Sequence, residues 1–375
     1  MRCDRRAVLT LLSSAATAST VRPSEAATDP AARLDRLLRE QKASHDLRSV
    51  MLAAWNGERR IYARALGLSR DGEPARLGMH FRAAVVMTTY LNALALWLAD
   101  RGRLDLDASI HRWLPDLPLA REVTLRMLGN NSSGYGDYLD SPPFAASNQR
   151  SFLKIHWTPA ELIRLGTALP IAFEPGTGFR YAHTNAVILG EALQRATGRS
   201  LRSLVRCAFL QPYGLRHTEV PDSFAIRRPV MHAFSREFGR YEDSTQFDPS
   251  WVSWSGWLNS NLHDLGRWAR LLGSGAILSR RSYRALLAPS NVGRGGNEPD
   301  LYYGLGVIIA NGWITQNGRY FGWNPVIAYL PARRIAIAAF TTFGPRSQDL
   351  SHALRIVKAA ALILAPERPI PARYA

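Results

Sequence analysis

Four side chains of this 375-residue chain stand out as candidates for proton transfer or attack on a carbonyl group. Tyr181 and His183 lie two residues apart in the segment FRYAHTN, and such a pair can relay a proton within hydrogen-bonding distance. Thr88 and Thr89 offer hydroxyl groups in the apolar segment VVMTTYLNALALWLAD. We therefore consider hydrolysis or acyl transfer with His183 as the general base. A purely structural hydrogen-bonding role for His183 stays open.

The threonines lie in a segment, from about Ala83 to Arg101, that is predicted to form a buried helix. It is apolar nearly all round, and Gly102 follows it, as is common after the last turn of a helix. Earlier in the chain, residues 48–69 are typical of two strands joined at Asn56-Gly57, which is a strong hairpin signal.

The C-terminal part of the chain favours strands. Residues 301–314, 319–331 and 334–343 are predicted to be successive strands, and residues 349–364 a closing helix. Residues from about 103 to 300 are expected to be helical and rich in loops, because prolines interrupt them repeatedly.

Residues 81–107, FRAAVVMTTYLNALALWLADRGRLDLD, carry a family resemblance. They are similar to the active-site helix of the serine β-lactamase and penicillin-binding-protein family, in the branch of class C β-lactamases and D-alanyl-D-alanine carboxypeptidases. That family has the pattern Phe-Arg-x-x-Ser-x-x-Lys, and Phe81 and Arg82 match its start. Val85 stands at the position of the serine and Thr88 at that of the lysine.

Five further segments resemble this family in the same order, namely 123–138, 173–200, 210–220, 257–272 and 302–307. The resemblance implies an α/β fold of the β-lactamase/transpeptidase type, in which helices flank an antiparallel sheet and an all-helical lobe is inserted. We expect residues 27–84 and 301–375 to form the sheet lobe. Residues 85–300 are expected to form the mainly helical lobe that carries the degenerate active-site helix.

The family's other two motifs are also altered in this chain. Tyr181-Ala182-His183 corresponds to Tyr-Ser-Asn, and we match Tyr320-Phe321-Gly322 to the Lys-Thr-Gly or His-x-Gly of the strand that lines the cleft. Gly322 would then let a ligand lie against this strand. We predict one aromatic ligand-binding cleft, joined by a tryptophan from residues 251–257 and lined by Val85, Tyr181, His183, Tyr320, Gly322 and Trp323. The same side chains would alternatively refill a cavity and bind nothing.

Covalent acyl transfer requires a nucleophile and a group that activates it, and Val85 and Thr88 supply neither a serine nor a cation. The leading hypothesis is an exported β-lactamase-related protein that lacks the serine acyl-enzyme mechanism and acts as a ligand-binding or accessory pseudoenzyme. The alternative is a hydrolase or transacylase (an esterase, peptidase or β-lactamase-like enzyme) whose site is rebuilt from Thr88, Tyr181 and His183. A third possibility is a role in processing a specialised metabolite.

The first 26 residues predict an export signal, of twin-arginine type or an ordinary secretory signal, because arginines precede a short apolar run. We therefore expect a periplasmic or secreted protein with no transmembrane segment after the signal. Its mature form would contain Cys207 as its single cysteine and hence no internal disulfide bond.

The expected partner is a small-molecule or peptide-like ligand in the cleft between the lobes. The net charge of +17 makes anionic envelope components possible additional partners, although a solvated basic surface explains it equally well. We expect no nucleic-acid partner. No metal-ligand spacing or phosphate-binding loop is found in the sequence, so neither a metal nor a cofactor is predicted.

Overall fold

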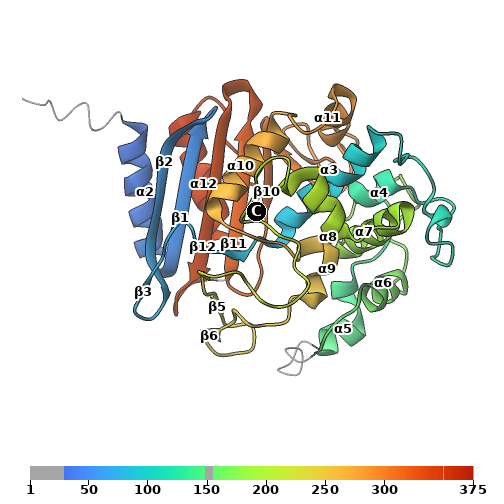
Figure 1. Ribbon diagram of the computed structural model, residues 1–375, viewed down its shortest axis with the longest axis horizontal. Helices are drawn as coiled ribbons and strands as arrows, with labels where there is room; N and C mark the ends of the chain where they lie inside the picture. The colour runs from blue at the N-terminus through green and yellow to red at the C-terminus, as the bar shows by residue number, and fades with distance from the viewer. Residues whose placement is uncertain (1–28, 148–154, 349, 375) are drawn as a thin grey trace, which may run out of the picture.

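An eight-stranded antiparallel sheet forms the first lobe of the protein (Figure 1). The computed structural model describes residues 29–147, 155–348 and 350–374. The strand order is β3-β2-β1-β12-β11-β10-β9-β8, so β1 pairs with β12 and joins the two ends of the chain. The strands are β1 (Leu47–Asn56), β2 (Arg59–Arg70), β3 (Glu73–Pro74), β8 (Leu301–Tyr303), β9 (Ile308–Ala310), β10 (Trp313–Asn317), β11 (Trp323–Leu330) and β12 (Ile335–Phe343).

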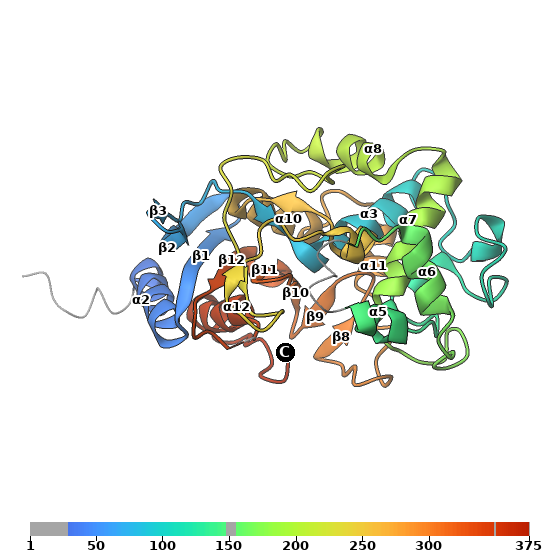
Figure 2. The ribbon, with the colours of Figure 1, turned by 90° about the horizontal axis from the view of Figure 1, so that it is seen from below.

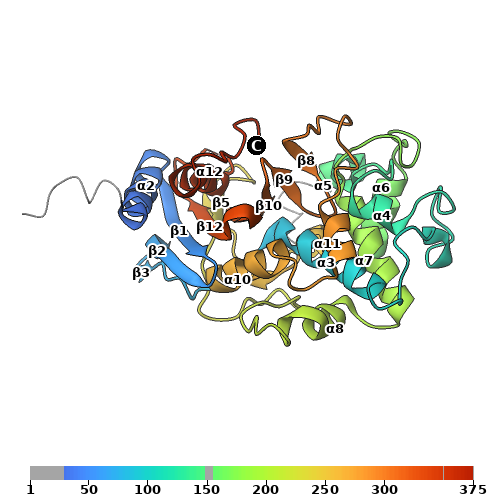
Figure 3. The ribbon, with the colours of Figure 1, turned by 90° about the horizontal axis from the view of Figure 1, so that it is seen from above.

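The central strands β1, β11 and β12 are buried on both faces, because successive side chains point to opposite sides and each side is covered by an apolar cluster. On β1, Val50 and Leu52 contact the apolar cluster formed by α2 (Pro30–Ser44) and α12 (His352–Leu364). Met51 and Ala53 belong to the second apolar cluster, which includes α10 (Leu262–Gly273). Figures 2 and 3 show α2 and α12 on one side of the sheet and α10 on the other.

The second lobe is mainly helical and surrounds α3 (Met87–Ala99). All residues of α3 except Trp97 and Ala99 are buried, which explains why its sequence is apolar nearly all round. The other helices of this lobe are α4 (Leu125–Gly129), α5 (Pro142–Ser147), α6 (Pro159–Thr167), α7 (His183–Thr197), α8 (Leu201–Val205), α9 (Ser253–Gly256) and α11 (Arg280–Leu286). Four two-residue strands form two pairs outside the main sheet, namely β4 (Phe81–Arg82) with β7 (Asn259–Ser260), and β5 (Phe234–Ser235) with β6 (Glu242–Asp243).

The predicted fold class, the hairpin at Asn56-Gly57 and the buried helix are confirmed. One helix of the middle segment, α10, packs on the sheet, so residues 85–300 are not confined to the helical lobe. The predicted export signal of residues 1–26 lies outside the described residues. Within the described ranges, no helix combines the length and the apolar character needed to span a bilayer.

The segment between β10 and β11 differs from the predicted strand 319–331. Residues 319–322 form a turn, because Phe321 and Gly322 have φ angles of 36° and 91°. Asn324 at the start of β11 fixes this turn: its Nδ2 atom donates to the carbonyl oxygen of Gly318 at 2.7 Å. Its Oδ1 atom accepts a hydrogen bond from the backbone N–H of Ala353 at 2.8 Å, which ties the turn to α12.

Replacing the buried Asn324 with leucine is expected to lower the free energy of unfolding by about 2–4 kcal/mol, because a buried carbonyl and a buried N–H both lose their partner. Urea denaturation measures this change. The control is Thr341→Val, which removes only a 3.5 Å contact with Asn324 and should cost less than about 1 kcal/mol. Equal losses in the two variants would contradict the clamping role of Asn324.

Candidate functional site

The start of α3 places Val85 at the floor of a cleft of about 720 Å³. A 3₁₀ turn over Ala84–Val86 precedes the helix, and the buried Ala84 has a φ angle of 47°. This left-handed conformation costs a non-glycine residue about 1–2 kcal/mol, so the surrounding structure must enforce it. The half-buried side chain of Val85 thus occupies the position predicted for the nucleophile, and it offers the cleft no hydroxyl group.

The end of β10 forms the wall next to Val85. A Cβ atom at Gly318 would lie 2.7 Å from the backbone nitrogen of Val85 and 2.7 Å from the Cβ atom of Ala84, so only glycine permits this contact. Gln316-Asn317-Gly318 lines the cleft and therefore occupies the place of the family's third motif. Our assignment of that motif to Tyr320-Phe321-Gly322 is wrong, because the sequence offers two x-x-Gly segments four residues apart.

Both threonines of α3 point into the core. The Oγ1 atom of Thr88 lies 2.9 Å from the backbone oxygen of Val85 and 3.2 Å from that of Gly306, and it accepts a hydrogen bond from Gln316 at 3.0 Å. Thr89 donates to the backbone oxygen of Val86 and accepts a hydrogen bond from Trp268. The placement of Thr88 contradicts its predicted role as a cleft nucleophile, since its side chain is buried and its hydroxyl group is engaged.

A neutral network surrounds Thr88 where the family has a lysine. Burial raises the pKa of Tyr303 to about 12, although hydrogen bonds with Thr88, Gln316 and Asn131 oppose this rise. Burial also raises the pKa of Tyr181 well above its ordinary value, and the nearby Tyr303 and Asp137 add to the rise. Both phenols are therefore protonated at neutral pH, and Tyr181 cannot serve as a phenolate base there.

Two side chains of a neighbouring loop hold Tyr181-Ala182-His183 at the start of α7. Asn131 accepts a hydrogen bond from the backbone N–H of Ala182 at 3.1 Å. Asp137 accepts one from the backbone N–H of His183 at 3.2 Å, so its negative charge lies at the positive end of the helix. Tyr181 and His183 both line the cleft, and their rings pack edge to face with centroids 5.1 Å apart.

His183 and Asp137 form a hydrogen-bonded pair in the cleft wall. The Nδ1 atom of His183 lies 2.8 Å from Oδ2 of Asp137. Burial would raise the pKa of Asp137, but the hydrogen bonds and charge of His183 and the N–H of Leu139 outweigh it, so the pKa is lowered. The carboxylate is therefore ionised at neutral pH. Our sequence reasoning missed Asp137, which lies 46 residues before His183 and belongs to no pattern that we had assigned a chemical role.

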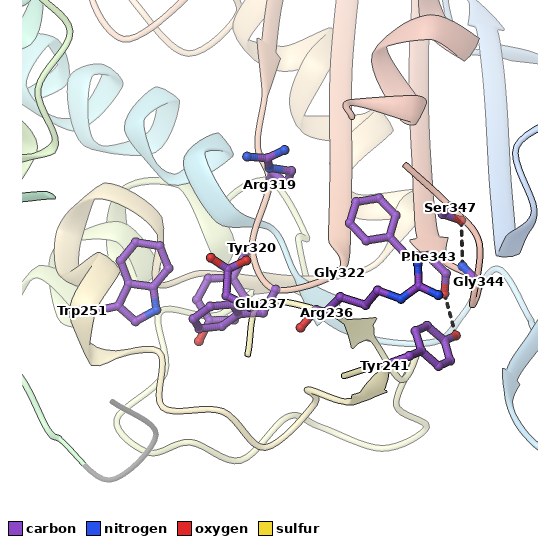
Figure 4. A pocket seen from close by; sticks show the side chains of 12 residues that line it. Arg236, Glu237, Tyr241, Trp251, Arg319, Tyr320, Gly322, Phe343, Gly344 and Ser347 are labelled. Atoms are coloured by element: carbon purple, nitrogen blue, oxygen red, sulfur yellow. Dashed lines mark hydrogen bonds between the residues drawn. The ribbon is translucent and has the colours of Figure 1, made fainter. Parts of the chain in front are cut away.

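The remaining aromatic residues lie away from this cleft. Tyr320 and Gly322 line a second cavity of about 450 Å³, in which Trp251 stacks on Tyr320 with centroids 5.6 Å apart (Figure 4). Trp323 is fully buried, and the guanidinium group of Arg82 lies 5.8 Å and 5.7 Å from the ring centroids of Tyr320 and Trp323. The prediction of one shared cleft therefore holds for Val85, Tyr181 and His183 and is wrong for the other three residues.

Gly322 is required by the fold. A Cβ atom there would lie 2.1 Å from the backbone oxygen of Phe234, and the φ angle of 91° is strained for other residues. The expected reason for this glycine, a ligand lying against it, is thus corrected: the neighbour is the chain itself. Within the described residues, no cluster of three or more His, Cys, Asp or Glu side chains is suited to a metal ion.

Thr88→Val is expected to lower the free energy of unfolding by about 1–2 kcal/mol, because the buried amide of Gln316 loses one acceptor. Ligand binding in the cleft should stay within about twofold of the natural protein, a change below about 0.4 kcal/mol. Thermal unfolding measures the change in stability, and calorimetric titration measures ligand binding. The matched control is Thr89→Val, because Thr89 is equally buried. A stable Thr88→Val protein that loses a measured cleft activity would restore Thr88 as a site residue.

Asp137→Asn is expected to destabilise the protein at pH 7, since the lowered pKa of Asp137 means that the fold favours the carboxylate. This contribution is present above the ordinary pKa and is lost as the pH falls through the lowered folded-state pKa. The stability difference between natural and variant proteins should therefore shrink below about pH 4, in urea denaturation at a series of pH values. A difference independent of pH would show that Asp137 does not favour folding through its charge.

Comparison with known proteins agrees with this geometry. Residues 34–361 match the family model described as Beta-lactamase. Penicillin-binding protein 4* of Bacillus subtilis (strain 168) is 23% identical over 351 residues, which are 87% of this chain and 75% of that protein. Esterase EstB of Burkholderia gladioli is 32% identical over 212 residues, 51% of this chain and 52% of the esterase.

The fold also matches solved structures. A D-stereospecific amidohydrolase from Streptomyces sp. superimposes with a TM-score of 0.77, at 24% identity over 88% of this chain and 98% of the other. The names of two of these proteins, an esterase and an amidohydrolase, describe hydrolases. Because the matched model spans most of its length, this chain belongs to the β-lactamase family.

Proposed function

We propose that this protein binds an ester- or amide-type compound, either a small molecule or a peptide-like ligand, without forming the family's acyl-enzyme. The observation that carries the proposal is Val85 at the cleft floor, in the place of the nucleophile. The burial of Thr88 supports it, because no hydroxyl or cation of α3 takes over.

The lining of the cleft supports a bound ligand. Its walls are rich in aromatic side chains, and these give a flat or apolar group a large contact area. They come from residues far apart in the chain: Phe179, Tyr181, Tyr302, Tyr303 and Tyr374. Among the described lining residues none is an aspartate or a glutamate, which favours a neutral or anionic ligand.

Strain next to Val85 is a further support. Ala84 adopts a left-handed conformation, and Gly318 packs on the backbone of Val85. Such strain is characteristic of functional sites, and here it persists without a nucleophile to present. A cleft held in shape at this cost is consistent with selection for binding.

Hydrolysis is the second candidate function. The relatives named above include an esterase and an amidohydrolase, and His183 faces the cleft with a carboxylate partner. Of the rebuilt site predicted from the sequence, Thr88 lies in the core, whereas Tyr181 and His183 do share the cleft.

We also propose that the protein acts outside the cytoplasm, and that its basic surface contacts anionic envelope components.

The test combines intact-protein mass spectrometry with calorimetric titration. After incubation with a fluorophosphonate and a fluorescent penicillin, we expect no increase in mass of the natural protein. Penicillin analogues, p-nitrophenyl ester analogues and D-amino acid amides should include at least one compound that binds. Tyr181→Ala should weaken that binding at least tenfold, about 1.4 kcal/mol, because one aromatic wall is lost.

Tyr213→Ala is the matched control, since this half-buried tyrosine lies outside the cleft lining. A stoichiometric adduct on the natural protein would overturn the proposal, as would equal weakening by both tyrosine variants. In parallel, the double variant Val85→Ser, Thr88→Lys tests whether the surrounding structure still supports acylation. Labelling of this variant alone would support the loss of the nucleophile and of its activating lysine as the reason why the natural protein is not acylated.

A further inference from the structure

Simple ligand binding does not require a buried pair of a histidine and a carboxylate, yet His183 and Asp137 form one in the cleft wall. The two side chains are mostly buried, with exposed fractions of 16% and 10%, and lie 2.8 Å apart. His183 nevertheless lines the cleft that contains Val85. A histidine that contacts a carboxylate on one side and a ligand cleft on the other has the geometry of a general base.

The hydrogen bond fixes which nitrogen of His183 carries the proton. An ionised carboxylate only accepts hydrogen bonds, so Nδ1 of a neutral His183 must donate to Asp137. The lone pair of Nε2 is then available as a proton acceptor. Asp137 is fixed in turn, because it also accepts hydrogen bonds from the backbone N–H groups of His183 and Leu139.

We propose that His183 activates a water molecule for direct hydrolysis of an ester or amide bound in the cleft, with Asp137 as its positioning residue. This inference rests on the proposed binding function and adds a reaction to it. Nε2 of His183 takes a proton from water while the water oxygen bonds to the carbonyl carbon. The tetrahedral intermediate then loses its alkoxide or amine, which receives the proton from the imidazolium, so that an acid and an alcohol or amine are released.

Asp137 supports both stages of this reaction. It orients the ring before proton transfer, and its negative charge stabilises the imidazolium that forms. The carboxylate is held in place by three hydrogen bonds from the start of α7 and its own loop. Proton transfer by a positioned side chain contributes about 10²–10⁴-fold to a rate, so turnover should be slow compared with that of a complete serine enzyme.

Water is the nucleophile that the cleft composition favours. Among the described lining residues, Ser351 alone is a serine or threonine, and its hydroxyl group already contacts the side-chain amide of Asn324 at 3.2 Å. The phenols of Tyr181 and Tyr303 have raised pKa values because they are buried. None of these groups lies in hydrogen-bonding contact with His183 in the structure, and a water molecule needs no such fixed partner.

The experiment measures hydrolysis of a p-nitrophenyl ester by the natural protein and by His183→Gln and Asp137→Asn. We expect steady release of p-nitrophenol without a burst, since no acyl-enzyme accumulates. Both substitutions should lower kcat by about 10²-fold or more while KM stays nearly constant. D₂O should slow the reaction, because a proton of water is transferred to Nε2 of His183 as the water attacks.

His232→Gln is the matched control. His232 forms the same kind of pair with Asp243, at 2.7 Å, but outside the cleft lining. This variant should hydrolyse the ester at the natural rate. Equal loss of activity in His232→Gln and His183→Gln would mean that imidazole groups act without regard to position, and would overturn the proposal.

Calorimetric titration with a non-hydrolysable ketone analogue of the ester separates this inference from the binding function. If the analogue does not bind, the proposed function and the inference both fail. If it binds and turnover equals that of His183→Gln, the water-activation step alone is overturned. An ester adduct on Ser351 or on His183 itself, together with a burst, would replace water by a protein nucleophile and would also overturn it.

Discussion

The contact between the end of β10 and the start of α3 is the constraint on which the cleft depends. Gly318 packs on the backbone nitrogen of Val85, an approach that any side chain at position 318 would prevent. Asn324 holds the carbonyl oxygen of Gly318 and ties it to α12, so the sheet lobe fixes the position of this glycine. The backbone before α3 is therefore held in a defined position, and the side chain that it presents to the cleft is a valine.

A neutral network occupies the place of the family's lysine. Thr88, Gln316 and Tyr303 share hydrogen bonds among themselves and with the backbone of Gly306. A buried cation would need a counter-charge or several acceptors to offset the loss of hydration, and this network needs neither. Because this network is neutral, it contains no cation that would favour deprotonation of Tyr181. In our proposal, acid–base chemistry in the cleft therefore depends on the start of α7, where Asp137 provides the negative charge.

Much of the fold could be predicted from the sequence because local patterns specify it. Asn56-Gly57 demands a tight turn between two strands, and the length of the apolar run after Ala83 fits only a buried helix. The site could be predicted only where a family motif was unambiguous. Val85 was located by its spacing from Phe81 and Arg82, whereas the third motif rested on a single glycine and was placed four residues too late.

Two features of the site depend on tertiary packing, which a pattern along the chain does not contain. Thr88 was expected in the cleft because of its position in the motif, yet a threonine is too short to extend past the backbone as a lysine does, and its hydroxyl group is satisfied in the core. Asp137 meets His183 only because the loop that carries it lies against the start of α7. The central claim is that this cleft binds acyl compounds without a covalent bond to the protein, and a crystal structure after soaking with a reactive p-nitrophenyl phosphonate tests it most directly. We expect a phosphonate in van der Waals contact with Val85 and Tyr181 and not bonded to any side chain. Density continuous from phosphorus to a protein oxygen or nitrogen, or a cleft left empty at saturating concentration, would contradict non-covalent binding.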